Sequence, residues 1–99
     1  MKKIEFLPLG SVVVLEGGSQ RVIIVGRGLN VNDQGETFFF DYAGVPYPNG
    51  MVGDRIAYFD HDAIARVFFT GYSDDEDKII VDRMNEYIAE NPDLKRRRV

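Results

Sequence analysis

The chain's only histidine is the residue with the widest choice of chemistry. His61 stands between Asp60 and Asp62, and a histidine beside carboxylates could act as a general base or bind a metal ion. Adjacent residues rarely converge on one ion, however, and the sequence has no cysteine and no second histidine to complete a site. We therefore expect a capping or surface role for His61, with no metal site.

Two other motifs resemble known sites only in part. Gly26 and Gly28 have the spacing that begins a dinucleotide fingerprint, but Val31 stands where its third glycine should be. The acidic run Asp74–Asp77 lacks the ligand spacing of a calcium loop. The serines fall at a strand start, a turn and a helix start, which are not nucleophile settings. The sequence therefore predicts a protein that is not an enzyme, with no catalytic residue and no cofactor.

Length and charge favour a single domain that binds neither DNA nor RNA. The chain has 99 residues and a net charge of −4, which suits one modest core and disfavours a general nucleic-acid binder. A basic run at 95–98 could touch nucleic acid or anionic lipid, but a solvated chain end is the simpler interpretation. No stretch reaches the roughly 20 apolar residues of a membrane span. We expect a soluble cytoplasmic protein.

The elements that must position these residues are mostly short β-branched runs. Residues 11–16 and 20–28 flank the Gly17-Gly18 pair and predict a hairpin, and 30–36 predicts a second turn. Because no helical pattern separates the first strands, the fold class is α+β: a mostly antiparallel five-stranded sheet, open or curled into a small barrel, then a C-terminal amphipathic helix. The later strands are expected at 37–44, 55–60 and 66–71. The single domain should cover 1–92, with a flexible basic tail at 93–99.

The helix is expected from about residue 74 to 90. Ser73 and Glu76 have capping-box spacing, and the acidic first turn complements the helix dipole. Pro92 ends the helix. The apolar stripe predicted to face the sheet is Ile80, Met84, Tyr87 and Ile88.

The loop YAGVPYPNG at 42–50 is the candidate partner-binding segment. Its prolines lower the flexibility of the loop, and its glycines are expected to act as hinges or positive-φ positions. Tyrosines at a loop rim suit protein interfaces. The alternative is that the loop packs over the end of the sheet and closes the core. The residues predicted to contact a partner are Tyr42, Tyr47, Pro48 and Asn49.

Several motifs in combination resemble one family of small bacterial proteins. The Leu-Pro-Leu-Gly-Ser-Val-Val run is at 7–13 and the Asp-Tyr…Gly…Tyr-Pro…Gly pattern is at 41–50. A Phe-x-His-acidic pattern at 59–62 and a closing Gly-Tyr at 71–72 complete it. Over roughly residues 6–88 the chain resembles domain-of-unknown-function family 4176, whose members are encoded beside LXG-toxin genes in Gram-positive type VII secretion loci. The basic tail is not part of the resemblance.

The resemblance implies a cytoplasmic accessory protein or chaperone. Such a protein would bind an LXG effector toxin and keep it soluble and ready for export. An immunity protein that neutralises the toxin is the alternative from the same loci. A generic regulatory binding module and an enzyme or metal-binding domain using His61 also remain open.

Overall fold

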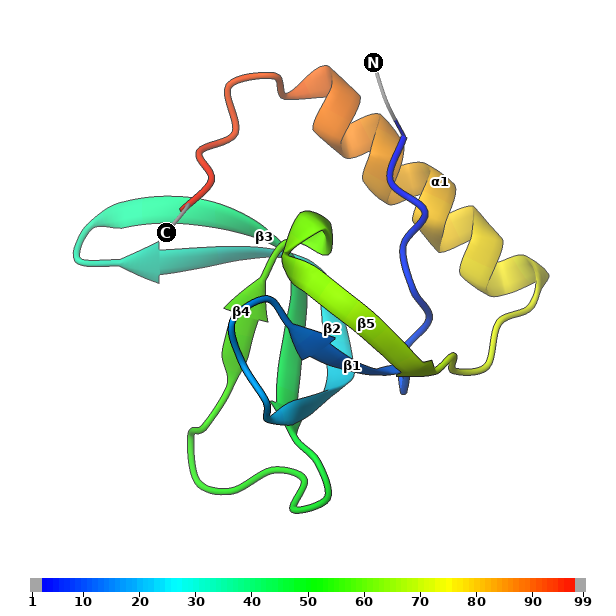
Figure 1. Cartoon of the computed structure of the whole chain (residues 1–99). Coiled ribbons are helices and arrows are strands. Elements are labelled where there is room, and N and C mark those ends of the chain that lie inside the picture. Colours follow the sequence, from blue (N-terminus) through cyan, green and yellow to red (C-terminus); the bar gives the residue numbers. More distant parts are fainter. Residues whose placement is uncertain (1–2, 98–99) are drawn as a thin grey trace.

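A meander of four strands and one returning strand form the sheet of this computed structural model, which describes residues 3–97 (Figure 1). All strand pairs are antiparallel and the order is β4-β3-β2-β1-β5, an open sheet. The strands are β1 (Val12–Leu15), β2 (Arg21–Asp33), β3 (Glu36–Pro46), β4 (Ala57–Phe59) and β5 (Ile64–Phe69); η1, a 3-10 turn (His61–Ala63), joins β4 to β5, and α1 (Asp75–Glu90) follows. The predicted α+β fold is confirmed.

The β2–β3 hairpin is longer than the sequence predicts. The expected turn over 30–36 is wrong, because the two strands stay paired as far as Asp33 and Glu36. Only Gln34 and Gly35 form the connection, with φ of 52° and 84°. Two consecutive positive φ values are typical of the two-residue turns that match the twist of a hairpin. The hairpin therefore projects beyond the rest of the sheet (Figure 1).

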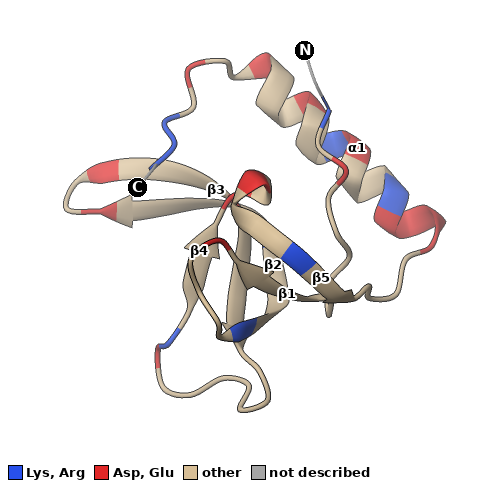
Figure 2. Ribbon diagram, viewed as in Figure 1, with Lys and Arg blue, Asp and Glu red and all other residues tan. Residues whose placement is uncertain are grey.

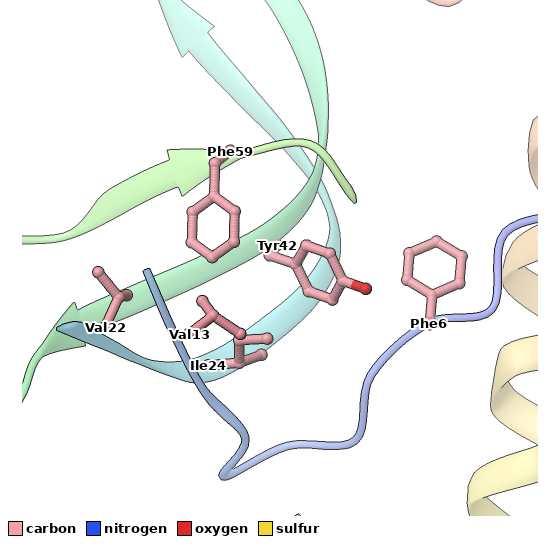
Figure 3. Close-up of a cluster of buried hydrophobic side chains, with 6 residues drawn as sticks. All are labelled: Phe6, Val13, Val22, Ile24, Tyr42 and Phe59. Atoms are coloured by element: carbon pink, nitrogen blue, oxygen red, sulfur yellow. The ribbon is translucent and has the colours of Figure 1, made fainter. Parts of the chain in front are cut away.

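The cluster of buried side chains formed by Phe6, Val13, Val22, Ile24, Tyr42 and Phe59 lies on one face of the curled sheet. Val13 pairs with Val22 across β1 and β2, and both are buried. Tyr42 has no exposed surface and lies between the rings of Phe6 and Phe59, with centroids 5.7 and 5.3 Å away (Figure 3). Aromatic pairs at these distances stabilise a core beyond the area they bury.

The helix packs on this core through a stripe that differs from the predicted one. Val81, Met84 and Ile88 contact the core cluster, whereas Ile80 is 46% exposed. The expectation that Ile80 faces the sheet is therefore wrong, because the next residue, Val81, takes that place. The end of the helix agrees with the prediction, since Asn91 is the C-cap and Pro92 follows it.

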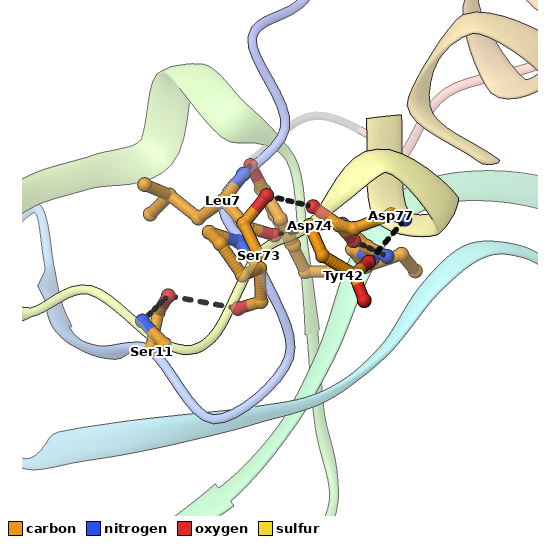
Figure 4. Close-up of polar contacts among 9 residues, drawn as sticks. Leu7, Ser11, Tyr42, Ser73, Asp74 and Asp77 are labelled. Carbon is orange, nitrogen blue, oxygen red and sulfur yellow. Dashed lines mark hydrogen bonds and ion pairs between the residues drawn. The ribbon is translucent and has the colours of Figure 1, made fainter. Parts of the chain in front are cut away.

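The helix begins one residue later than the capping box predicts. Asp74 is the N-cap, and its Oδ1 accepts from the backbone N–H of Asp77 at 3.0 Å. The Ser73 hydroxyl donates instead to the Asp77 carboxylate at 2.8 Å (Figure 4). Both residue types can cap a helix, so sequence alone does not separate the neighbours.

An almost buried ion pair fixes the helix start to β2. Arg27 Nη2 lies 2.6 Å from Asp77 Oδ1, and its Nη1 donates to the carbonyl of Leu7 at 3.2 Å. Burial alone would raise the pKa of Asp77. The hydrogen bonds from Ser73 and Arg27 and the Arg27 charge outweigh burial and lower this pKa below its ordinary value.

The described part of the C-terminal tail is in contact with the domain. Lys95, Arg96 and Arg97 each pair with a carboxylate, and the carbonyl of Lys95 accepts from the backbone N–H of Phe39 at 2.8 Å. Residues 95–97 of the tail that the sequence predicts to be flexible thus contact the domain through their side chains. Val99 and Arg98 lie outside the described residues. Among the helices described, none is both long and apolar enough to cross a membrane.

Candidate protein-binding surface

The four residues predicted to meet a partner divide between the core and the surface. Tyr42 lies in the core, so its expected place at the loop rim is wrong. Tyr47, Pro48 and Asn49 are exposed at the end of β3, where the buried run stops at Pro46. Only the last three can therefore contact a partner without opening the core.

The exposed loop is held in a defined shape by backbone contacts. The Tyr47 N–H donates to the carbonyl of Arg21 at 2.9 Å, and Gln20 Nε2 donates to the carbonyl of Tyr47 at 2.8 Å. The Gly50 N–H returns to the carbonyl of Pro46 at 2.7 Å, and Gly50 has a φ of 78°. The expected positive φ at Gly50 is confirmed. A loop fixed in this way loses less conformational entropy when it binds.

At position 44, glycine is favoured by the lack of space for a side chain and not by its backbone angle. Its φ is not positive, so the expectation of a hinge or a positive-φ position is wrong there. A Cβ at this position would lie 2.2 Å from Val22 Cγ1 and 3.0 Å from the carbonyl oxygen of Ile23. Gly44 therefore lets β3 pass close to the core side chains of β2.

The exposed loop continues onto the outer face of the sheet. Val14 of β1 pairs with Arg21 of β2 and with Arg66 of β5, and residues directly opposite each other share a face. Val13 and Val22 face the core, and their sequence neighbours Val14 and Arg21 therefore face outward. Arg66, which pairs with Val14, faces outward with them. Phe68 follows Arg66 by two residues and lies on the same face.

Two arginines connect the aromatic rings on this face. The guanidinium carbon of Arg21 lies 4.7 Å from the ring centre of Tyr47 and 5.7 Å from that of Phe68. The guanidinium carbon of Arg66 lies 4.8 Å from the centre of the same Phe68 ring. Tyr47 and Phe68 are 37% and 46% exposed, so these cation–π contacts are at the surface. We name Arg21, Tyr47, Arg66 and Phe68 the outer patch.

A groove of about 310 Å³ adjoins the loop. Its walls come from the buried end of β3 and from the segment that leads into β4, including Pro46, Arg55 and Ile56. Arg55, which follows Asp54 in the sequence, adds a third cation next to this groove. Acidic residues also occur along α1 and at the tip of the β2–β3 hairpin (Figure 2). The surface around the outer patch thus combines aromatic rings with positive charge. Tyr, Phe and Arg are enriched in protein interfaces for this combination of properties.

His61 lies at a second, larger groove but its ring is tied to the core. Its Nδ1 is 2.7 Å from the Tyr42 hydroxyl, which also accepts from the Leu7 N–H at 2.9 Å. Burial raises the pKa of Tyr42 to about 12, so the phenol is neutral at pH 7. The phenol O–H is then free to donate to the imidazole. The groove, of about 900 Å³, runs between the N-terminal segment and residues 61–67.

Two buried carboxylates beside His61 form a structural network with the tail. Arg96 Nη1 lies 2.9 Å from Oδ1 of both Asp41 and Asp60. Asp60 Oδ1 also accepts from the Asp41 N–H, and Asp41 Oδ2 accepts from the backbone N–H of His61. Burial raises the pKa of Asp41 above its ordinary value, against the opposing effects of the His61 N–H and Arg96 and with the Asp60 charge adding to it.

This network does not have the geometry of a catalytic triad. The Asp41 carboxylate contacts the backbone N–H of His61, and the imidazole Nδ1 contacts a phenol. Ser11 is buried, donates to the carbonyl of Pro8 at 2.7 Å and accepts from the N–H of Gly71 at 2.9 Å, which is a structural arrangement (Figure 4). Between residues 3 and 97, no group of three or more His, Asp or Glu side chains is arranged to hold a metal ion.

Sequence reasoning missed Phe68, Arg21 and Arg66 as site residues. They come from two strands that are not adjacent in the sequence, and β1 lies between those strands in the sheet. The signals that could have found them are the place of Arg21 next to the buried Val22 and the two-residue spacing of Arg66 and Phe68, which puts both on one face of β5.

Comparison with known proteins gives a family and no relative of established function. No curated protein and no solved structure matches the chain. One family model, Domain of unknown function (DUF4176), matches residues 6–80, which include every strand and the start of α1. The matched region is most of the chain, and the protein therefore belongs to the DUF4176 family.

Proposed function

We propose that this protein is a non-enzymatic binding module for an LXG effector toxin of type VII secretion. It keeps the effector soluble and ready for export in the cytoplasm. The resemblance to a family encoded beside LXG genes supports this class of partner. The outer patch is the observation that supports a binding role, because it presents exposed aromatic rings and cations next to a shaped loop.

The energetics of interfaces explain why we place the effector on the outer patch. Tyrosine and arginine are frequent among the residues whose truncation costs most binding energy. Tyr47 is held by backbone bonds to its neighbours before a partner arrives, and its side chain keeps a free surface. Binding then requires little reordering of the loop.

The experiment is a pull-down of the LXG effector encoded in the same locus with the tagged full chain. Tyr47→Ser and Phe68→Ser should each lose the effector while keeping the melting temperature within a few degrees of the unchanged protein. Tyr87→Ser is the matched control, since Tyr87 has a similar exposure of 41% but lies on α1. A folded Tyr47→Ser, Phe68→Ser double variant that still retains the effector would contradict the assignment of the outer patch.

An immunity role is the second candidate from the same loci. The two roles differ in which part of the effector the protein must bind. A chaperone should co-purify with an effector that lacks its toxic domain, and it need not lower toxicity. An immunity protein should require the toxic domain and should protect a target cell that expresses the toxin.

A further inference from the structure

The described part of the tail occupies an edge of the sheet that β4 leaves open. β4 is short and pairs only with residues 42–44 of β3. The Phe39 N–H points to this open side and donates to the carbonyl of Lys95 at 2.8 Å. The Asp41 N–H, two residues on, is satisfied by the Asp60 carboxylate at 3.1 Å. The first half of β3 is thus an unpaired edge that accepts an extended chain.

Carboxylates line this edge at intervals that match a basic segment. Lys95 pairs with Glu36, Arg97 pairs with Asp33, and Arg96 bridges Asp41 and Asp60. We name Asp33, Glu36, Asp41 and Asp60 the acidic edge. Phenylalanine rings lie beneath the cations, with Arg97 4.7 Å from the Phe38 ring centre and Arg96 4.8 Å from that of Phe39.

The middle position of the acidic edge differs from the outer two. The side chains of Asp41 and Asp60 are 3% and 6% exposed, and that of Arg96 is 18% exposed. The Lys95 and Arg97 pairs are about half exposed on their basic side. A buried pair of carboxylates requires a cation that can reach both, and a long guanidinium does so. The outer positions need only positive charge.

We propose that the acidic edge is a docking site for an extended basic segment of a partner protein, with an arginine at the place of Arg96. The chain's own tail is the occupant in the absence of that partner. The charge of the site is complementary to such a segment, and the tail shows the fit. All four carboxylates fall inside the family match at 6–80, whereas the tail lies outside it. This surface is distinct from the outer patch: the tail runs beside the β2–β3 hairpin, and the loop after β3 is at the far end of the sheet (Figure 1).

Competition between the tail and a free peptide tests this proposal. The probe is a fluorescein-labelled peptide with the sequence of residues 91–99, measured by fluorescence anisotropy against the full chain. The tethered tail has a high effective concentration, so the unchanged protein should bind the probe weakly. Arg96→Ala in the full chain releases the site and should bind the probe at least about tenfold more tightly. A control peptide with alanine at the place of Arg96 should bind this variant at least about tenfold more weakly than the probe does.

The outcomes separate the possible occupants. Equal affinity of the two proteins for the probe, or equal affinity of the variant for both peptides, overturns the proposal. If Arg96→Ala does not fold, Arg96→Lys decides in the same assay: tighter binding than the unchanged protein supports the site, and unchanged affinity overturns it. A dimer of the unchanged protein in size-exclusion chromatography that Arg96→Lys abolishes would assign the site to a second copy, against the proposed partner.

Discussion

Replacing Gly44 with alanine is expected to destabilise the fold strongly, although it adds a single methyl group. The new Cβ would lie 2.2 Å from Val22 Cγ1, 3.0 Å from the Ile23 carbonyl oxygen and 3.3 Å from Phe59 Cε1. The first distance is far inside van der Waals contact. The second involves backbone that is paired in the sheet and cannot rotate away.

The magnitude follows from the way in which the core can respond. Overpacking a well-packed core by a methylene costs about 1–3 kcal/mol. Val22 is buried and β-branched, so it has few alternative rotamers to move into. We therefore expect a loss of about 2–3 kcal/mol in the free energy of unfolding. For a domain of this size, each kcal/mol corresponds to roughly 4–8 °C in melting temperature.

Urea denaturation of three single variants and one double variant isolates the cause. Gly18→Ala is the matched control, because its φ is also not positive and its Cβ would meet only the Leu15 carbonyl at 3.6 Å. Its midpoint should change little. Val22→Ala removes the clashing methyl, so the penalty of Gly44→Ala should fall by more than about 1 kcal/mol in that background. A Gly44→Ala protein within about 0.5 kcal/mol of the unchanged one, or a penalty unaffected by Val22→Ala, would refute the packing argument.

Three further predictions concern single polar side chains. Asp74→Ala should cost about 0.5–2 kcal/mol in urea melts and more than Ser73→Ala, since Asp74 makes the cap; equal losses would contradict this assignment. Asp77→Asn should be less stable than the unchanged protein above about pH 4, and the difference should disappear as the pH falls through the lowered pKa of Asp77, because only the charged carboxylate is stabilised by folding. Melts from pH 7 to 2 that show a constant difference would exclude this linkage. Ser11→Ala should lose about 1–3 kcal/mol, because the part-buried Gly71 N–H loses the buried Ser11 hydroxyl that accepts its hydrogen bond, and an unchanged urea midpoint would count against it.

The parts of the fold that were predictable are those with local signals. The Gly17-Gly18 pair between β-branched runs predicts the first hairpin, and the acidic first turn with Pro92 bounds the helix. The choice between Ser73 and Asp74 as cap was not predictable, because both side chains can accept the same kind of bond one residue apart. The local sequence pattern therefore predicts the helix but leaves its first residue uncertain by one position.

The parts that were not predictable depend on distant residues. Alternation puts Phe38 and Phe40 on one face of β3 and Phe39 on the other, yet all three are buried. They are buried because α1, the tail and the neighbouring strands cover both faces. The place of Tyr42 in the core and the pairing of Arg96 with two buried carboxylates also depend on residues that are distant in the sequence. Sequence reasoning found the exposed part of the loop, since prolines and glycines act locally. It could not identify the arginines and the phenylalanine that complete the outer patch.

The contact between Ile4 and Asn85 has a consequence for the order in which the chain can fold during its synthesis. The Ile4 N–H donates to Asn85 Oδ1 at 2.8 Å, and Asn85 Nδ2 returns to the Ile4 carbonyl at 2.9 Å. The first described residues are thus paired with the last helix, 81 positions later. A ribosome adds roughly 5–20 residues per second, so the last strand, which ends at Phe69, is synthesised only roughly 1–3 seconds before Asn85. Until then Ile4 lacks both of its hydrogen bonds to α1, and the N-terminal segment is held to the sheet only by contacts nearer β1, such as those of Phe6 and Leu7 with Tyr42.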